Sequence, residues 1–225
     1  MHDKEIQKAR SSAQRQILAD LGCILEGNYF IALKDGMVTK KYVDVGPLLA
    51  RPDLLEVMVE EMLRSMPSER LKKIDTVVGP APIGIAFAYA TARAYQRLTG
   101  HLPNVAFAEE VGNKFEFKRK GFKEVIRGKN VLVIGGMGST GLSTAEIVNE
   151  VRALGGKVRE TCFLWNRGNI TPGQVGSPTC SLIDEVILKW IPEECPEWGE
   201  LPLVTDIGHP EYFPDYKGGY ISLLK

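Results

Sequence analysis

The stretch VLVIGGMGSTGLS, residues 131–143, restricts the fold of this chain more than any other segment. Its first four residues, 131–134, are apolar and mostly β-branched, which predicts a strand buried on both faces. A glycine-rich loop is expected next, and from Ser143 apolar residues recur at helical spacing until Gly155-Gly156 ends the helix. A strand, a glycine-rich turn and a helix start place backbone N–H groups at the positive end of a helix dipole, where phosphate groups bind.

The predicted phosphate site comprises the loop and the first turn of this helix. Hydroxyl groups add hydrogen-bond donors to the backbone N–H groups. The residues expected to bind phosphate are Gly138, Ser139, Thr140, Gly141 and Ser143. A glycine-rich turn between a strand and a helix also occurs as plain structure, so that interpretation stays open.

A second pattern overlaps the same loop. Residues 136–141 match the G-x-G-x-x-G sequence of dinucleotide-binding folds, between a predicted strand and a predicted helix. The next predicted strand, 158–165, is followed by Asn166-Arg167 and not by the carboxylate that would bind a ribose 2′-hydroxyl, although an arginine suits a 2′-phosphate. More than half of the chain precedes the motif, which is unusual for that fold. An NAD(P)-binding oxidoreductase is therefore one alternative.

Composition excludes several classes of protein. The 28 basic and 28 acidic residues cancel, which favours neither nucleic acid nor an anionic membrane as a partner. The four cysteines are scattered and no histidine stands at metal-ligand spacing, so no metal site is predicted and reduced thiols in a cytosol are expected. The charged N-terminus, with no apolar segment behind it, predicts no signal peptide, and the uncharged run 76–92 is interrupted by glycine and proline. A cytoplasmic protein is expected.

The order of predicted elements is typical of an α/β protein, with strands and helices alternating over 70–190 and a parallel sheet covered on both faces. Before it come a helix over 3–21, a hairpin around Asp35-Gly36 and a helix that begins at Pro52. The basic segment 109–129 is expected to be a mobile loop or a protruding hairpin. The expected division is an N-terminal hood and arm, 1–68, a core, 69–191, and a C-terminal tail, 192–225, that wraps over the domain or a partner subunit.

The central motif resembles that of the type I phosphoribosyltransferases. In that family a buried strand, two acidic residues and a Thr-Thr-Gly-like loop bind the 5-phosphate of phosphoribosyl pyrophosphate (PRPP). Here the strand and the loop Ser139-Thr140-Gly141 are similar, but Gly135 and Gly136 stand where the two carboxylates belong. Over residues 20–205 the order of arm, G-P-A-x-x-G turn, basic loop, phosphate motif and strand-end arginine resembles orotate phosphoribosyltransferase.

This resemblance implies roles for residues outside the motif. FIALKDG and FLWNRG are similar to segments that contact the base, which assigns base binding to Lys34 and Arg167. The turn that receives pyrophosphate corresponds to Pro80, Ala81 and Gly84, although Ile83 replaces a lysine used by some members. FKRKGF is similar to a flexible basic loop that closes over the reaction, formed here by Lys118, Arg119 and Lys120.

Some of these residues have an alternative interpretation without a functional role. Lys34 could equally be an exposed hairpin lysine, and the basic run 118–120 could be a solvated charge run. The three histidines, His2, His101 and His209, are assigned no role.

The implied fold is a parallel sheet flanked by helices, and the implied reaction transfers phosphoribosyl from PRPP to a carboxylated pyrimidine such as orotate, with Mg²⁺, in a homodimer. Gly135-Gly136 predicts reduced activity, because carboxylates there would stabilise a ribose cation and anchor the ribose hydroxyls. Losing one such partner costs on the order of 100-fold in rate. Glu109 and Glu110, at the end of the neighbouring predicted strand, are the candidates for replacing these carboxylates. A protein that binds or senses a nucleotide or phosphoribosyl compound without chemistry is the other alternative.

Overall fold

The computed structural model describes residues 2–112 and 114–223, and of residues 2–10 it describes the backbone alone. Its contacts divide the chain into two compact units. The first unit contains the residues up to Ile17 together with Leu48–Val186, and the second contains Leu18–Pro47 together with the residues from Ile187 onward. This grouping differs from the three-part division expected from the sequence, because the helices after residue 48 join the core and the tail joins the N-terminal hairpin.

The first unit contains a six-stranded sheet of order β5-β4-β3-β6-β7-β8, in which β5 alone is antiparallel to its neighbour. Its strands are β3 (Thr76–Pro80), β4 (Asn104–Val111), β5 (Lys114–Glu116), β6 (Asn130–Gly138), β7 (Lys157–Asn166) and β8 (Thr179–Asp184). The helices are α3 (Pro52–Arg64), α4 (Ser68–Leu71), α5 (Ile83–Thr99), α6 (Phe122–Ile126), α7 (Leu142–Ala153) and α8 (Pro172–Val175), and α2 (Gly46–Leu49) precedes them. The predicted α/β class is confirmed.

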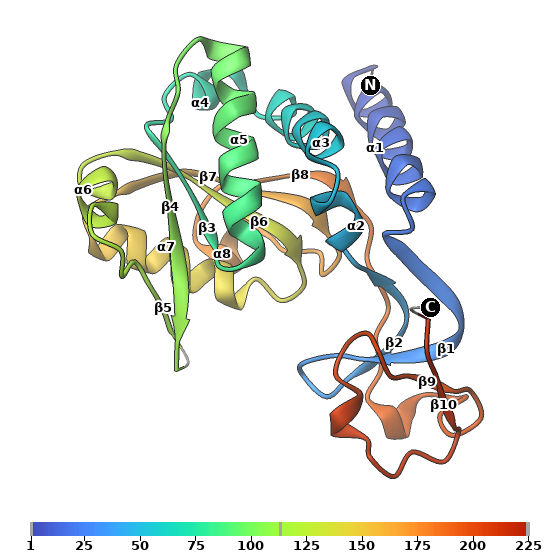
Figure 1. The fold of residues 1–225 in the computed structure, drawn as a ribbon. Coiled ribbons are helices and arrows are strands. Elements are labelled where there is room, and N and C mark those ends of the chain that lie inside the picture. The colour runs from blue at the N-terminus through green and yellow to red at the C-terminus, as the bar shows by residue number, and fades with distance from the viewer. Residues whose placement is uncertain (1, 113, 224–225) are drawn as a thin grey trace. The chain divides into compact units, whose positions relative to one another are not determined.

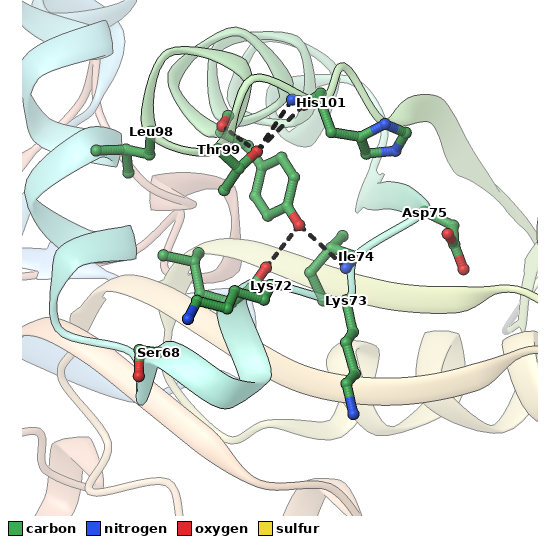
Figure 2. Close-up of a pocket in the computed structure, with 10 residues that line it drawn as sticks. Ser68, Lys72, Lys73, Ile74, Asp75, Leu98, Thr99 and His101 are labelled. Carbon is green, nitrogen blue, oxygen red and sulfur yellow. Dashed lines mark hydrogen bonds between the residues drawn. The ribbon is translucent and has the colours of Figure 1, made fainter.

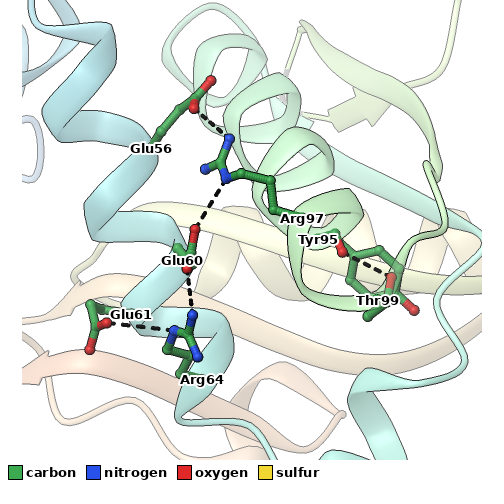
Figure 3. Close-up of polar contacts among 7 residues, drawn as sticks. All are labelled: Glu56, Glu60, Glu61, Arg64, Tyr95, Arg97 and Thr99. Atoms are coloured by element: carbon green, nitrogen blue, oxygen red, sulfur yellow. Dashed lines mark hydrogen bonds and ion pairs between the residues drawn. The ribbon is translucent and has the colours of Figure 1, made fainter.

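Helices cover both faces of this sheet. Figure 1 shows α5 crossing one face, with α3 beside it, and α7 lying on the other. As predicted, α3 begins at Pro52 and buries an apolar stripe: Leu55, Met58, Val59, Met62 and Leu63. Arg97 on α5 reaches Glu56 and Glu60 on α3, at 2.5 and 3.1 Å (Figure 3). These side chains are partly exposed, so the apolar stripe contributes more to this packing than the ion pairs do.

The central strand is longer than the sequence predicted. A loop was expected to begin at Gly135, but β6 continues to Gly138, because residues 135–138 still pair with β7: Gly135 opposite Phe163, and Gly138 opposite Asn166. The loop is therefore restricted to residues 139–141. Helix α7 begins at Leu142, after Gly141 adopts a φ of 79°, a conformation that glycine adopts without strain.

The basic segment 109–129 forms a hairpin of β4 and β5 followed by α6, which confirms the expected hairpin. Phe117 and Ile126 from this segment are buried in the apolar core between the sheet and α7. The segment is thus anchored on the sheet at its returning end.

The second unit is built on the predicted hairpin of β1 (Ile24–Ala32) and β2 (Val38–Val43), which turns at Asp35-Gly36. Two short strands of the tail, β9 (Leu203–Val204) and β10 (Tyr220–Ile221), extend this sheet in the order β10-β9-β1-β2. The ring of Trp198 packs 5.5 Å from that of Phe30 and 4.3 Å from that of Tyr216, measured between centroids. The tail is therefore part of the same small sheet as the N-terminal hairpin.

Helix α1 (His2–Asp20) precedes this hairpin and ends two residues before Gly22, the predicted stop, which has a positive φ. The tail also contains the short 3₁₀ helices η1 (Pro192–Glu194) and η2 (Pro210–Tyr212). Among the described residues, no helix combines the length and apolarity needed to cross a membrane.

A buried carboxylate links α4 to the sheet. Glu160 on β7 is fully buried and its Oε2 accepts a hydrogen bond from Arg70 on α4. Its Oε1 has no hydrogen-bond partner within the described part of the chain. Burial raises the pKa of Glu160 above its ordinary value of 4.5, although the guanidinium of Arg70 opposes that rise.

We expect Glu160→Gln to remove a pH-dependent contribution to stability. Because the pKa of Glu160 is raised in the folded state, the folded protein binds a proton at a higher pH than the unfolded chain does. This proton uptake stabilises the folded state, and the contribution is fully present at or below about pH 4.5. It is lost as the pH rises through the raised pKa. In urea unfolding between about pH 8 and about pH 5, wild type should gain stability relative to Glu160→Gln as the pH falls. Glu69→Gln, at an exposed position on α4, is the control and should show no such change. A constant difference for Glu160→Gln would contradict the expectation.

Candidate functional site

The predicted site segments meet at one edge of the six-stranded sheet. Strands β3, β6 and β7 are adjacent and parallel, so their carboxyl ends lie together. The turn 79–84 follows β3, the loop 139–141 follows β6, and Arg167 follows β7. Ligands of open α/β sheets bind at this edge. The fold therefore brings together three of the segments that the sequence singled out, including Pro80, Ala81, Gly84 and Arg167.

The loop 139–141 rests on the end of β7. The backbone N–H groups of Arg167 and Gly168 both donate to the carbonyl oxygen of Gly138, at 2.9 and 3.1 Å. A Cβ atom at Gly168 would lie 1.5 Å from the carbonyl oxygen of Ser139, so only glycine permits this approach. These contacts fix where the loop begins.

The loop leaves its own backbone donors available. Within the described chain, the N–H groups of Ser139, Thr140 and Gly141 donate to no backbone carbonyl, and the N–H of Leu142 donates to Oγ1 of Thr140 at 3.4 Å. The side chains of Thr140 and Ser143 are exposed. Three successive amides and two hydroxyl groups at the start of the 12-residue helix α7 form an arrangement that can bind a phosphate.

The turn 79–84 is closed tightly on itself. A Cβ atom at Gly79 would lie 2.6 Å from the carbonyl oxygen of Gly84, and one at Gly84 would lie 2.6 Å from Cδ of Pro80. The N–H of Ala81 donates to the carbonyl of Ala108 on β4 at 2.8 Å. The two glycines therefore allow α5 to begin directly against the end of β3, beside the loop after β6.

Two phenyl rings fill the positions where the acidic pair would project. Cβ atoms at Gly135 and Gly136 would each lie 2.9 Å from a ring, that of Phe163 on β7 and that of Phe87 on α5, respectively. Both phenylalanines are fully buried. Gly135 also faces Thr144 of α7, so the two rings cover opposite faces of β6. Neither phenylalanine was predicted from the sequence. The available signal was a pair of glycines at the end of a strand, which indicates close approach by a neighbouring group.

An apolar cluster packs against the glycines at both ends of the loop. Phe163, Ile170 and Val175 are buried together. A Cβ atom at Gly138 would lie 2.7 Å from Cδ1 of Ile170, and one at Gly141 would lie 3.2 Å from side-chain carbons of Ile170 and Val175. Gly138 and Gly141 thus pack against hydrocarbon side chains. The hydrogen-bond donors of this site are the backbone amides and hydroxyl groups of the loop.

Neither expected substitute for the acidic pair lies beside β6. Glu109 and Glu110 are on β4, which β3 separates from β6. Two strand spacings amount to about 10 Å. The carboxylate of Glu109 is also bound by Arg119, at 2.6 Å. Mg²⁺ is usually held by one or two carboxylates together with substrate phosphates. The loop 139–141 and the strand end at Gly135-Gly136 contribute no carboxylate, so these residues do not fit the ion.

The remaining predicted residues lie elsewhere. Lys118, Arg119 and Lys120 are exposed on the segment that returns from the β4–β5 hairpin, where Lys118 lines a hollow of about 670 Å³ with Lys123 and Glu150. Lys34 is exposed in the turn of the second unit. The roles of Lys34 and of the basic run stay predictions.

A further cavity lies at the opposite edge of the sheet. It has a volume of about 530 Å³ and is lined by residues before β3 and at the end of α5, among them Ser68, Lys72 and His101 (Figure 2). In its wall, the hydroxyl of Tyr95 donates to the carbonyl of Leu71 and accepts from the N–H of Ile74. No residue of the predicted site lines this cavity.

The strand order defines an α/β protein, and the loop at the carboxyl edge of its sheet presents backbone amides and hydroxyl groups that can bind an anion. No protein-family model matches the chain. Orotate phosphoribosyltransferase of Carboxydothermus hydrogenoformans is 30% identical over 184 residues, which cover 80% of this chain and 89% of that protein. The corresponding protein of Caldanaerobacter subterraneus is 31% identical over 192 residues, 84% of this chain and 93% of that protein.

Solved structures show the same fold. A crystal structure of orotate phosphoribosyltransferase from Aeropyrum pernix aligns with a TM-score of 0.60 and 20% identity, covering 75% of this chain and 92% of that one. Adenine phosphoribosyltransferase from Saccharomyces cerevisiae aligns with a TM-score of 0.56 and 18% identity, covering 76% and 99%. The chain belongs to the type I phosphoribosyltransferase family.

The dinucleotide fingerprint does not form its usual loop here. Gly136 and Gly138, its first two glycines, lie in β6 and not in the turn that would receive a pyrophosphate. The NAD(P)-binding alternative is therefore wrong in its structural premise, because pairing with β7 extends the strand through both glycines.

We expect Gly136→Ala to lower the free energy of unfolding by about 1–3 kcal/mol, because its methyl group would overlap the buried ring of Phe87. The cost should be smaller in a Phe87→Leu background, which leaves room for the methyl group. Gly173→Ala is the control, since the nearest atom to its Cβ is 3.9 Å away. Guanidinium unfolding of the four variants of the cycle measures this coupling. Equal costs in both backgrounds would show that the ring does not set the requirement for glycine.

Proposed function

We propose that this protein binds PRPP and transfers its phosphoribosyl group to a carboxylated pyrimidine such as orotate, at a reduced rate. The observation that carries the proposal is the run of available amides at residues 139–141 at the start of α7, beside the turn 79–84. The relatives at about 30% identity are named orotate phosphoribosyltransferase, which supports the choice of base.

In this proposal each segment of the edge has one task. The loop and Ser143 bind the 5-phosphate, and the turn at Pro80, Ala81 and Gly84 receives pyrophosphate. The bond between C1 of the ribose and the pyrophosphate oxygen breaks, pyrophosphate leaves with the electron pair, and a ring nitrogen of the base forms the new bond to C1 and loses its proton. Arg167 and Lys34 orient the base, and the basic run 118–120 neutralises the leaving group.

The same geometry explains why the rate would be low. Bond breaking leaves positive charge on the ribose, and no carboxylate projects from Gly135 or Gly136 to stabilise it. Losing preorganised charge stabilisation costs on the order of 100-fold or more in rate. The family resemblance implies Mg²⁺, but the loop and Gly135-Gly136 contribute no carboxylate to hold it, so no step is assigned to the ion. The implied homodimer remains part of the proposal.

A second candidate is a protein that binds a nucleotide or phosphoribosyl compound without chemistry. The positions of Phe87 and Phe163 favour it, because both rings are buried and close the space that the acidic side chains would need. Both candidates require the phosphate loop, and turnover distinguishes them.

Orotate consumption with PRPP and Mg²⁺ in a coupled assay tests the proposal. We expect turnover above background, but about 100-fold or more below that of a relative with the acidic pair. Ser139→Ala/Thr140→Val removes two hydroxyl donors to a charged phosphate and should raise the KM for PRPP roughly tenfold or more. Ser12→Ala, at an exposed helical position, is the control and should change neither kcat nor KM.

The outcomes separate the candidates. Calorimetric binding of a phosphoribosyl compound without turnover would favour the binding protein over the transferase. A turnover number equal to that of relatives with the acidic pair would contradict the account of the missing carboxylates. No binding of any phosphoribosyl compound would contradict both candidates.

A further inference from the structure

The site combines a complete phosphate loop with a ribose region that has lost its acidic groups. Gly135 and Gly136 occupy the two positions of the acidic pair, three and four residues before the loop begins at Ser139. Carboxylates at such positions would accept hydrogen bonds from ribose hydroxyls and attract a divalent cation. The consequence depends on what the structure places there instead.

Hydrocarbon fills both positions. The ring of Phe163 lies against Gly135, and the ring of Phe87 lies against Gly136 from the opposite face. Neither ring has any exposed surface. A carboxylate at either position would displace a packed ring or remain ionised against it, and an ionised group in hydrocarbon is strongly unfavourable.

The acidic groups that end the outer strands at this edge are each separated from β6 by another strand. Asp184 ends β8, beyond β7, and accepts a hydrogen bond from Ser181. Glu109 is bound to Arg119, and Glu109 and Glu110 both lie on β4, beyond the intervening β3. The loop and the first turn of α7 contribute neutral amides and four hydroxyl groups, those of Ser139, Thr140, Ser143 and Thr144. These are donors suited to phosphate oxygens, and amides offer nothing to a cation.

We infer that this site holds the sugar phosphate part of its ligand through the 5-phosphate, and that it binds sugar phosphate monoesters without a divalent cation and without hydrogen bonds that distinguish the ribose diol. The inference rests on the proposed phosphate site and narrows its ligand class. Ribose 5-phosphate and 2-deoxyribose 5-phosphate carry the same phosphate and differ at one hydroxyl of the sugar. A site that lacks the acidic acceptors binds both with similar affinity.

Calorimetric titration of the full chain with these two sugar phosphates, each in EDTA and in Mg²⁺, tests the inference. We expect the two dissociation constants to agree within about threefold, and Mg²⁺ to change each by no more than about threefold, since a hydrogen bond to a charged acceptor would give roughly tenfold or more. Ser139→Ala/Thr140→Val should weaken both ligands equally, and Ser12→Ala should weaken neither.

Three results would overturn the inference. Tenfold tighter binding of the ribose form would show that the diol is read, and binding that requires Mg²⁺ would show that a cation is held; in both cases the phosphate site itself would stand. Absence of binding by both sugar phosphates would remove the phosphate site and the proposed function with it. The three results are distinguishable in one set of titrations.

A variant that restores one acidic group supplies the converse test. Phe87→Ala opens space beside Gly136, and Gly136→Asp in that background places a carboxylate where the ring had been. The double variant should prefer ribose 5-phosphate by roughly tenfold, whereas Phe87→Ala alone should show no preference. Thermal unfolding of both variants confirms that they are folded under the conditions of titration. Equal affinities in a folded double variant would overturn the assignment of Gly136 as the position that reads the diol.

Discussion

The packing of β6 against two phenyl rings determines both how the loop 139–141 is supported and which chemical groups lie beside it. A strand that carries three glycines within four residues has no side chains of its own at those positions, so the neighbouring Phe87, Phe163 and Ile170 close onto its backbone. Protein interiors tolerate little empty volume, and a strand without side chains requires such neighbours. The glycines and the phenyl rings therefore depend on each other. A larger residue at one of the glycines requires a smaller residue in place of the ring that covers it.

This packing supports the loop and at the same time removes the acidic groups beside it. The apolar cluster of Phe163, Ile170 and Val175 lies under the loop, and Gly138 is held to the end of β7 by hydrogen bonds from two successive amides. The amides of residues 139–141 are thereby positioned for a phosphate on a rigid base. The same rings occupy the space in which a carboxylate would meet a ribose. The result is a family fold in which the loop presents amides suited to a phosphate and the two preceding strand positions are packed against hydrocarbon.

Much of the fold could be predicted because the apolar periodicity was strong. The buried strand from Val131, the helix that begins at Pro52 and the hairpin at Asp35-Gly36 all depend on local patterns, and the structure confirms them. The predicted end of β6 was wrong. Glycine has no side chain that would indicate a strand or a loop, and pairing with β7 decides which of the two these glycines form. Glu109 and Glu110 were candidates for replacing the acidic pair, but their distance from β6 depends on strand order, which the sequence does not state.

The sequence by itself determined the class of fold, the glycine-rich motif between a strand and a helix, and the presence of glycines where the related motif has two acidic residues, because each depends on residue types at short spacing along the chain. Tertiary structure decided what occupies the space of the lost carboxylates. Phe87 and Phe163 lie about 50 and 30 residues from the glycines they cover, and helix α5 and strand β7 bring them there. Contacts between distant segments depend on how helices and strands pack, and packing depends on the shape of the whole core and not on any local pattern.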